Sequence, residues 1–335
     1  MDYDWIFTDF AALPPDSAGR RAKRGRWQLV DYTTAEFAGT LIMANPGVGA
    51  PEVSIPLPLK GWYDLYLGFL VSYGDRLKVK LAGDRCYERL SVSVPAQGGA
   101  FQDVFFRTVE LTGSDVLRLK QDTGAYAEVG IRAAVGYLLA KKTEERPGPN
   151  AGLLLHVTDD GWPSNWGFPE DHEDHAWLVE PQARLGAKIV SFGIDIHGMA
   201  NYASRHDSLR LPAAEIAREY EGTFAYEHGA KELPIIAEEI REGFKVPELY
   251  YRRCWEQGMR PFGYSRMAHL RPPPPYDAEG SALYDAHPEY RCLDIDGAPI
   301  SRLSIACPEV RAEFLKLFAE QVEMGAEGVN NVFVR

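Results

Sequence analysis

The second half of this 335-residue chain alternates between two kinds of segment. A short apolar run is followed by a longer stretch with helical periodicity, and the pair recurs about four times from Gly152 onward. Parallel strands need a long crossover, which a helix usually supplies, so this order predicts βα units in one parallel sheet. The strands are expected at residues 152–157, 188–194, 260–264 and 328–335.

The length of this half limits its architecture. A closed (β/α)8 barrel needs roughly 250 residues, whereas 335 residues less the first 150 leaves 185. The apolar runs at 152–157 and 328–335 are typical of strands buried on both faces. We therefore expect a partial α/β barrel at 151–335, made of about the first four βα units and ending after the fourth strand.

The helices are indicated by periodicity and by end signals. Residues 171–185 predict a helix that ends at the following glycine, and further helices are expected at 235–244 and 247–257. The clearest helix spans 308–325, with a proline in its first turn and a glycine at its end. Its expected apolar face consists of Val310, Phe314, Leu317, Phe318 and Val322.

The first half has a different pattern, without convincing helical periodicity. In 77–81, Leu and Val alternate with Lys, which places the apolar side chains on one face of a strand and the lysines on the other. Nine such runs between turn signals predict an all-β, jelly-roll-like sandwich at 1–140, followed by a polar, Pro-rich linker at 141–150. The nine strands are expected at 27–31, 39–44, 52–59, 62–71, 77–82, 87–94, 104–111, 116–120 and 129–139.

Three motifs in the second half follow one another in a familiar order. Residues 287–297 read HPEYRCLDIDG, 303–311 read LSIACPEVR, and 328–335 read GVNNVFVR. The series resembles the uncharacterised family 10-like glycosyl hydrolases, which are (β/α)8 TIM barrels preceded by a β-sandwich. The resemblance covers about residues 150–335, and only the part after His287 is specific. It implies a glycoside hydrolase that acts on a carbohydrate ligand.

Two departures from that family pattern bear on activity. The acidic residue usual three positions before the strand-ending Arg335 is replaced by Val332. The later strands, which carry further catalytic carboxylates in such barrels, are absent from this chain. We therefore expect an incomplete copy of the hydrolase that is inactive by itself.

Chemistry in a barrel of this kind is located at the carboxyl ends of the strands. Glycoside hydrolysis normally uses two carboxyl groups that flank the bond. Asp159, Asp160 and Asp195 lie at suitable strand ends and are weak catalytic candidates. The sequence assigns no acid or nucleophile among them, and the two adjacent aspartates can equally form a turn.

Sugar-binding side chains are expected at the same strand ends. Charged groups hydrogen-bond sugar hydroxyls and Trp rings pack on sugar rings, although tryptophans can instead cover a barrel mouth and polar groups can bind a neighbouring loop. Parallel strands place their following loops on one rim, so these residues are expected to converge. The expected substrate-binding residues are Asp160, Trp162, Trp166, Asp195, His197, Arg266, His269 and Arg335.

Other motifs indicate neither a metal nor a cofactor. Two histidines and three carboxylates at 171–175 can bind a metal, but they also suit a helix start, and we expect the latter. The basic run at 20–26 is expected to top a surface loop. The four cysteines have no C-x-x-C spacing, which indicates neither a zinc ribbon nor a disulfide framework.

Charge and hydropathy limit the partners. Residues 1–140 contain 15 Lys+Arg and 16 Asp+Glu, so residues 141–335 account for −11 of the net −12. An acidic second half repels phosphate backbones and anionic membranes, and we expect neither a nucleic acid nor a membrane as partner. The sequence has no transmembrane stretch and no signal peptide at its start, which predicts a cytoplasmic location.

Two classes of function follow from the sequence. The first is a carbohydrate-active glycoside hydrolase, of which this chain is an incomplete copy. The second is a non-catalytic carbohydrate-binding or structural protein, in which the sandwich binds the glycan. In either class, the open edges of a half barrel predict self-association.

Overall fold

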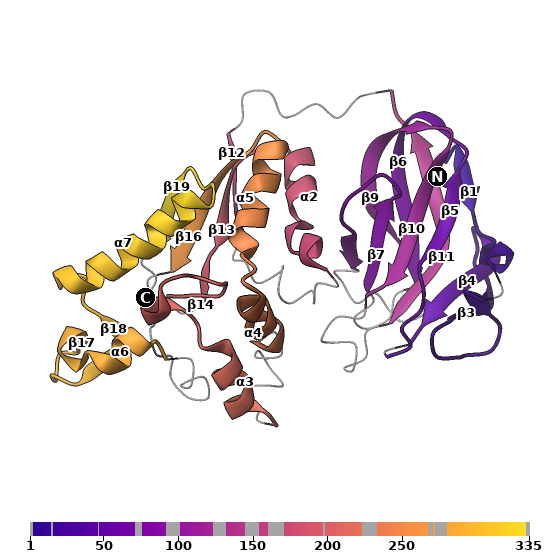
Figure 1. Ribbon diagram of the computed structural model, residues 1–335. Helices are drawn as coiled ribbons and strands as arrows, with labels where there is room; N and C mark the ends of the chain where they lie inside the picture. The colour runs from indigo at the N-terminus through magenta and orange to yellow at the C-terminus, as the bar shows by residue number, and fades with distance from the viewer. Residues whose placement is uncertain are drawn as a thin grey trace. The chain divides into compact units, whose positions relative to one another are not determined.

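The computed structural model divides the chain into two units, Met1–Gly148 and Pro149–Arg335, which we call the sandwich unit and the α/β unit (Figure 1). Separate clusters of buried apolar residues lie within each. The structure describes residues 3–14, 16–45, 47–70, 76–91, 101–122, 132–144, 154–159, 171–196, 198–222, 233–266, 271 and 280–332.

All nine strands expected in the first half are confirmed, with ends that differ by a few residues. The sequence did not predict the short strands β1 (Trp5–Phe7) and β2 (Ala18–Gly19) or the 3-10 turn η1 (Phe10–Ala12). The others are β3 (Trp27–Thr33), β4 (Ala38–Ala44), β5 (Val53–Leu57), β6 (Lys60–Leu70), β7 (Arg76–Leu81), β8 (Glu88–Ser91), β9 (Phe101–Thr112), β10 (Asp115–Gln121) and β11 (Ala133–Lys142).

The strands of the sandwich unit form two sheets that share one core. One sheet has the order β2-β3-β4-β11-β6-β9, with β1 paired to β11, and the other has the order β5-β10-β7-β8. From β4 to β11 the chain therefore crosses to the other sheet after each strand except β7, which is followed by β8 in the same sheet, and this is the order of a jelly roll. Hydrophobic side chains from both sheets, such as Leu67 and Leu119, meet in the core.

Two details of the sandwich unit differ from expectation. The alternation at 77–81 places Leu77 and Val79 in the core, but Lys78 on the opposite face is also buried, with 2% of its surface exposed. Strand β11 extends to Lys142, so the first residues of the expected linker belong to the sheet.

The α/β unit contains the four expected parallel strands and the expected helices, together with several short elements. The helical segments are η3 (His172–Ala176), α2 (Val179–Arg184), η4 (Asp207–Leu209), α3 (Ala213–Tyr220), α4 (Leu233–Glu242), α5 (Val246–Glu256), α6 (Ala282–Ala286), η6 (Pro288–Tyr290) and α7 (Pro308–Glu323). The strands are β12 (Leu155–Asp159), β13 (Ala187–Gly193), β14 (Asp195–Ile196), β15 (Met199–Ala200), β16 (Arg260–Arg266), β17 (Arg291–Leu293), β18 (Pro299–Leu303) and β19 (Gly328–Val332).

The four main strands form one parallel sheet in the order β12-β13-β16-β19 (Figure 1). Helices α2, α5 and α7 pack on the sheet through a core that includes Val190, Tyr250 and Leu317. Each helix follows one strand and leads to the next, as the βα rhythm of the sequence predicts.

The outer strands of this sheet are less buried than the sequence predicted. Among the described residues, β12 pairs only with β13, and β19 only with β16. Leu155 is 38% exposed, and the residues of β19 are mostly half-buried. The prediction of burial on both faces was wrong for these two strands, because an apolar run does not distinguish an edge strand from a central one.

Two helix predictions need correction. The helix expected at 171–185 is split into η3 and α2, and Pro181, which has no backbone N–H, lies in the first turn of α2. Helix α7 buries Val310, Phe314 and Leu317, whereas Val322 is 52% exposed and lies off the buried face. Gly186 follows α2 with a φ of 85°, in agreement with its expected role as a terminator.

The described residues between β16 and α7 form short elements of their own. Strands β17 and β18 form an antiparallel hairpin, and Asp294 Oδ1 accepts hydrogen bonds from the N–H groups of Asp296 and Ala298 in its turn. The Asp-x-Asp-Gly motif is therefore a turn, in which Gly297 has a φ of 81°.

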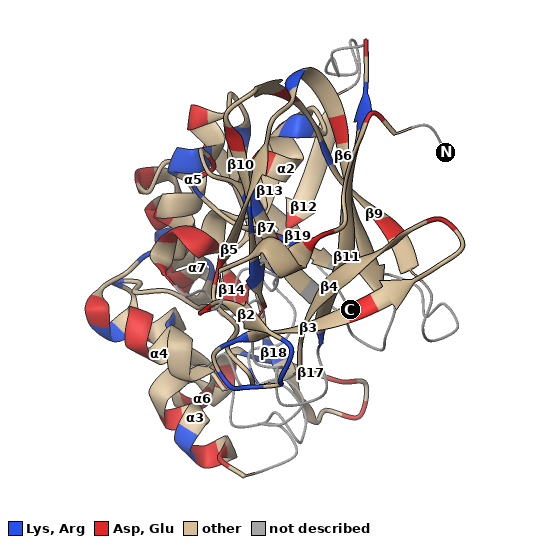
Figure 2. Cartoon of the chain, turned by 90° about the vertical axis from the view of Figure 1, so that its right-hand side faces the viewer, with Lys and Arg blue, Asp and Glu red and all other residues tan. Residues whose placement is uncertain are grey.

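The outer surface of the helices in the α/β unit is strongly charged. Acidic residues recur along α3, α4 and α7 (Figure 2). No helix in the described residues is both long and apolar enough to span a membrane.

Candidate functional site

The parallel sheet has one face against the helices and one face away from them. Phe192 of β13 stacks on Tyr250 of α5, with ring centroids 4.0 Å apart, so Phe192 faces the helices. Because side chains alternate along a strand, Ser191 and Gly193 face the other side, together with Tyr264, which pairs with Gly193.

Asp195 lies just beyond the carboxyl end of β13 and is 7% exposed. Its carboxylate accepts hydrogen bonds from the Ser265 hydroxyl and from the backbone N–H of Arg266, the latter at 3.4 Å. Burial raises the pKa of Asp195 to about 6, although these bonds and one from the Gly198 N–H lower it. A carboxyl group with this pKa exchanges its proton near neutral pH.

The local sequence explains the position of Asp195. The residue begins the two-residue strand β14, which turns back onto β15 with Asp195 opposite Ala200. Gly198 in this turn has a φ of 78°, which side chains other than glycine rarely adopt. Its N–H can therefore bond the carboxylate of Asp195.

Arg266 ends β16 beside Asp195, and the structure brings these two predicted site residues together. Its Nε donates to the Tyr264 hydroxyl at 3.4 Å, and its guanidinium centre lies 5.8 Å from the centroid of the same ring. The arrangement groups a carboxyl, a guanidinium and a phenol at one end of the sheet.

Asp159 ends β12, but its carboxylate faces the helices. The Tyr250 hydroxyl of α5 lies 2.9 Å from Asp159 Oδ2 and 3.0 Å from Gln182 Oε1 of α2. Asp159 is 4% exposed and thus joins β12 to two helices. Sequence reasoning placed it at the correct strand end, but the alternation of the strand turns it away from the face of Tyr264.

Six other predicted site residues lie outside the described part of the chain. Their roles stay predictions. They are Asp160, Trp162, Trp166, His197, His269 and Arg335.

His156 and Ser191 form a polar pair that the sequence analysis did not single out. His156 Nε2 lies 2.8 Å from Ser191 Oγ, and the two residues belong to the neighbouring strands β12 and β13. Because Ser191 faces away from the helices, this pair lies on the same face as Tyr264. Both residues are embedded in apolar runs, which is why the pattern of a buried strand concealed them.

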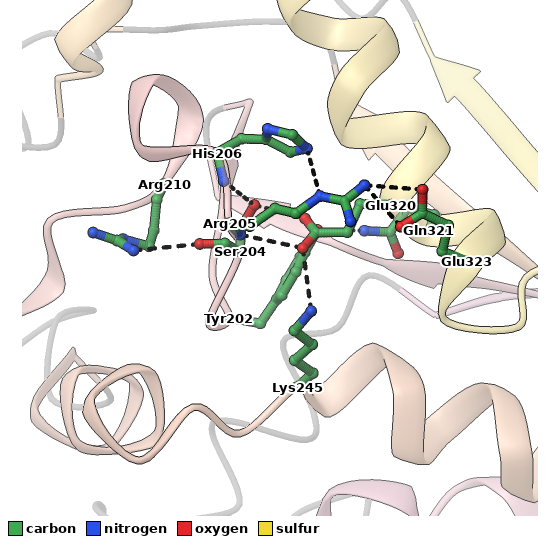
Figure 3. Close-up of polar contacts among 9 residues, drawn as sticks. All are labelled: Tyr202, Ser204, Arg205, His206, Arg210, Lys245, Glu320, Gln321 and Glu323. Carbon is green, nitrogen blue, oxygen red and sulfur yellow. Dashed lines mark hydrogen bonds and ion pairs between the residues drawn. The ribbon is translucent and has the colours of Figure 1, made fainter.

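A polar network of the α/β unit is centred on Glu320 of α7, which is 1% exposed (Figure 3). Its carboxylate accepts hydrogen bonds from Ser204 Oγ at 2.6 Å, the Tyr202 hydroxyl at 3.1 Å and the Arg205 N–H at 3.2 Å. Lys245 Nζ lies 3.3 Å away. Burial acts to raise the pKa of Glu320, but these donors together hold it below its ordinary value.

The network continues along α7 beyond Glu320. Gln321 donates to the Tyr202 hydroxyl at 2.5 Å and accepts from Tyr251 at 2.7 Å. Arg205 pairs with the exposed Glu323 at 2.7 Å (Figure 3). The network joins α7 and α5 to the segment at 202–206, so its geometry indicates a structural role.

The acidic motif at 171–175 forms the start of the helical segment η3. Asp171 Oδ1 accepts the Asp174 N–H at 3.1 Å, and His172 stacks on Phe244 with centroids 3.7 Å apart. His175 Nε2 bonds the buried Glu239. No group of three His, Cys, Asp or Glu suited to a metal ion occurs in the described part of the chain.

A cavity of about 580 Å³ lies beside this motif. It is lined by residues of α4 and of the start of η3, and its charged side chains are acidic, which disfavours an anionic ligand. The lining residues are Asp171, His172, Pro234, Ile235, Glu238, Glu239 and Glu242.

Similarity to known proteins is limited to solved structures. No protein-family model matches the sequence, and no curated protein matches it. A CBM36-1 domain of a multidomain xylanase from the hindgut metagenome of Trinervitermes trinervoides is 18% identical, with a TM-score of 0.25, over 37% of this chain and 92% of that domain.

Two larger carbohydrate-active enzymes also resemble this chain. The GH26-CBM35 β-(1,4)-mannanase of Podospora anserina is 14% identical, with a TM-score of 0.22, over 88% of this chain and 67% of that one. A GH36 α-galactosidase of Geobacillus stearothermophilus is 11% identical, with a TM-score of 0.31, over 88% of this chain and 44% of that one. TM-scores this low do not establish a shared fold, so the assignment of function rests on the geometry of this chain.

Proposed function

We propose that this chain is a carbohydrate-active protein of the glycoside hydrolase type, and that its parallel sheet is the first half of a (β/α)8 barrel. The observation that carries the proposal is Asp195, a buried carboxyl group with a pKa raised to about 6 at the carboxyl end of a parallel strand. Active sites in barrels occupy this end of the sheet.

The surroundings of Asp195 suit a sugar. A carboxyl group that is partly protonated near neutral pH can protonate a glycosidic oxygen, which is the role of the acid in glycoside hydrolysis. Arg266 and Tyr264 carry donors that can bond sugar hydroxyls, and both belong to β16. The same end of the sheet can therefore both hold a sugar and transfer a proton.

Hydrolysis needs a second carboxyl group, and Asp159 is a poor choice because it is held against α2 and α5. Asp160, which follows it in the sequence, is the better candidate, and the barrel's later strands are an alternative source. We accordingly expect residues 1–335 to bind a glycan without hydrolysing it.

A binding experiment tests the proposal. Soluble neutral polysaccharides are titrated with the protein and with Asp195→Ala and Trp162→Ala variants, each expected to lose about 1–3 kcal/mol of binding free energy. Glu327→Gln is the matched control, because Glu327 pairs with Arg260 at the amino end of the same sheet. Equal affinity in all four proteins would exclude a glycan site at this end of the sheet.

A second candidate function is a carbohydrate-binding protein without catalysis. The three groups that donate hydrogen bonds to the Asp195 carboxylate favour this function, because they hold the side chain in place at the turn between β14 and β15. Aryl glycosides distinguish the two functions. Hydrolysis by the wild-type chain that is lost in Asp160→Asn or Asp195→Asn would establish an active hydrolase and refute the expected inactivity.

The edges of the sheet support a further proposal of self-association. Strands β12 and β19 each have one neighbour among the described residues, and unpaired strand edges readily pair with another chain. Light scattering should therefore detect dimers or larger species. A monodisperse monomer would count against open edges.

A further inference from the structure

The outer face of the seven-stranded sheet in the sandwich unit carries a set of aromatic rings. On β6, Leu65, Leu67 and Phe69 point into the core, so the alternating residues Tyr66 and Gly68 point outward. Cross-strand neighbours share a face, which places Phe105 beside Tyr66 on β9, and Tyr137 beside Gly68 on β11.

The rings form two groups. In the first, the Tyr66 ring lies 6.1 Å from Tyr3 and 5.4 Å from Phe105, measured between centroids. In the second, Tyr137 lies 4.6 Å from Phe37 and 5.3 Å from Phe101, and Phe101 lies 4.8 Å from Tyr32. We call these rings together the aromatic face.

Asp103 joins the two groups. Its Oδ2 accepts the Tyr3 hydroxyl at 2.8 Å, and its Oδ1 accepts the Tyr137 hydroxyl at 2.8 Å. Burial and the bond to Asp103 raise the pKa of Tyr3 to about 12, so this hydroxyl keeps its proton at neutral pH. A carboxylate accepts about four hydrogen bonds, and the two tyrosines are the donors to Asp103 among the described residues.

Two glycines make room for the rings. A Cβ on Gly68 would lie 2.2 Å from the Tyr137 ring, and a Cβ on Gly136 would lie 2.3 Å from the Phe101 ring. Larger residues at these positions would lift the rings off the sheet. Glycine at both positions therefore allows the rings to lie against the sheet.

The aromatic face is accessible, and among the described residues the charged side chains that act on its tyrosines are acidic. Phe105 is 50% exposed, and Ile6, which shares this side of the sheet through its pairing with Leu139, is 45% exposed. The Asp103 carboxylate lies between the rings, and the Asp64 and Glu36 carboxylates also act on the tyrosines. A nucleic acid or an acidic polysaccharide would be repelled, and a purely apolar partner would offer Asp103 no donor beyond the two tyrosines.

We propose that the aromatic face binds a neutral polysaccharide chain. The CH faces of successive sugars pack on the rings, and sugar hydroxyls donate to Asp103. The apolar and the polar groups of the sugars thus both have partners on this face. This inference depends on residues other than Asp195. It holds or fails independently of the site proposed at the parallel sheet.

Affinity electrophoresis of the full chain in gels that contain arabinoxylan, galactomannan or hydroxyethylcellulose provides the test, with polygalacturonate as the anionic comparison. We expect retardation by at least one neutral polymer and none by polygalacturonate. Phe105→Ala should weaken the binding about tenfold, the scale of a lost ring contact. The exposed position of this ring makes the variant compatible with folding.

A control variant separates the possible outcomes. Leu315→Ala, at an apolar residue of α7 that is 62% exposed, should leave retardation unchanged. Equal retardation of Phe105→Ala and the wild type, or no retardation by any neutral polymer, would overturn the proposal. Concentration-dependent dimers that disappear in Phe105→Ala would overturn it as well, because the face would then bind a second copy of this chain.

Discussion

The interiors of the two units differ in what fills them. The sandwich core combines two sheets through apolar side chains such as Ile42, Leu67 and Phe69, each with no exposed surface. The α/β unit also has an apolar core, and of the charged side chains that both units bury, its Asp195 and Glu320 have pKa values shifted by burial and hydrogen bonds. The pH should therefore affect the stability of the α/β unit more strongly than that of the sandwich core.

The two buried carboxyl groups of the α/β unit should respond to pH in opposite directions. Donors lower the pKa of Glu320, so its stabilisation is complete above the pKa of the unfolded chain and is lost as the pH falls through the folded pKa. Burial raises the pKa of Asp195, so its ionisation destabilises the folded state as the pH rises through about 4 to 6.

The largest expected effect is that of Glu320→Ala. The substitution leaves the Tyr202 and Ser204 hydroxyls, the Arg205 N–H and the Lys245 ammonium without their acceptor. At pH 7 it should lower the free energy of unfolding of the α/β unit by about 3–5 kcal/mol, the scale of a broken buried ion pair. Hydrogen exchange in α7 measures this loss, and exchange in β6 should not change.

Glu323→Gln is the matched control for Glu320→Ala. Glu323 lies one position beyond Val322 on the same helix and pairs with Arg205 in solvent, so its loss should cost less than about 1 kcal/mol. If both variants lowered the free energy of unfolding by a similar amount, the buried contacts of Glu320 would stabilise the unit no more than an exposed ion pair does.

Leu67→Ala tests the sandwich core in the same way. Removal of this buried side chain should cost about 3 kcal/mol, because it leaves a cavity among packed residues of both sheets. The leucine side chain carries no ionisable group, so the cost should be equal at pH 5 and pH 8. A pH-dependent cost would break the contrast between the two interiors.

Asp195→Asn should reveal the opposite pH dependence. The pKa of Asp195 rises from 3.8 to about 6 on folding, which corresponds to about 3 kcal/mol between pH 4 and pH 7. The folded wild type holds this proton more tightly than the unfolded chain does, so its stability falls over this range. The variant should therefore gain about 2–3 kcal/mol relative to the wild type between pH 4 and pH 7.

Denaturant unfolding of both proteins at several pH values measures this gain. Every other titrating group is common to the two proteins and cancels in the difference. A constant difference across the range would mean that Asp195 has an ordinary pKa, and the catalytic role proposed for it would lose its basis.

The sequence predicted the elements of the fold well where the local pattern decides them. The alternation at 77–81 and the proline and glycine that bound α7 are set by residues within a few positions of one another. Strand β1 was not predicted because three residues carry too little pattern, and its position depends on pairing with β11 across the chain.

Burial and site geometry were less predictable, because they depend on distant neighbours. Asp159 faces α2 and α5 because of its place in the alternation of β12 and because the helices lie on that side of the sheet, which a position at the end of a strand does not reveal. Glu320 and Gln321 carried a signal that was overlooked. They continue the buried positions of Val310, Phe314 and Leu317 at helical spacing, where apolar residues would be expected.

The smallest expected effect compares two glycines whose surroundings are alike although their units differ. Gly25 in the sandwich unit has a φ of 72° and Gly258 after α5 has a φ of 71°, and a Cβ at either position would meet no atom within 4 Å. Alanine at each should therefore cost about 1 kcal/mol through backbone strain alone. This cost should not depend on pH, because no charge changes.

Unfolding of Gly25→Ala and Gly258→Ala at pH 5 and pH 7.5 tests how far the contrast between the units extends. Equal costs at both pH values would mean that the two units differ in pH dependence only through the side chains of their interiors. If the stability cost of Gly258→Ala changed with pH, charged groups near the end of α5 would also contribute to the pH dependence of stability. Arg253, which is buried on α5 and pairs with Glu173, would be the residue to substitute next.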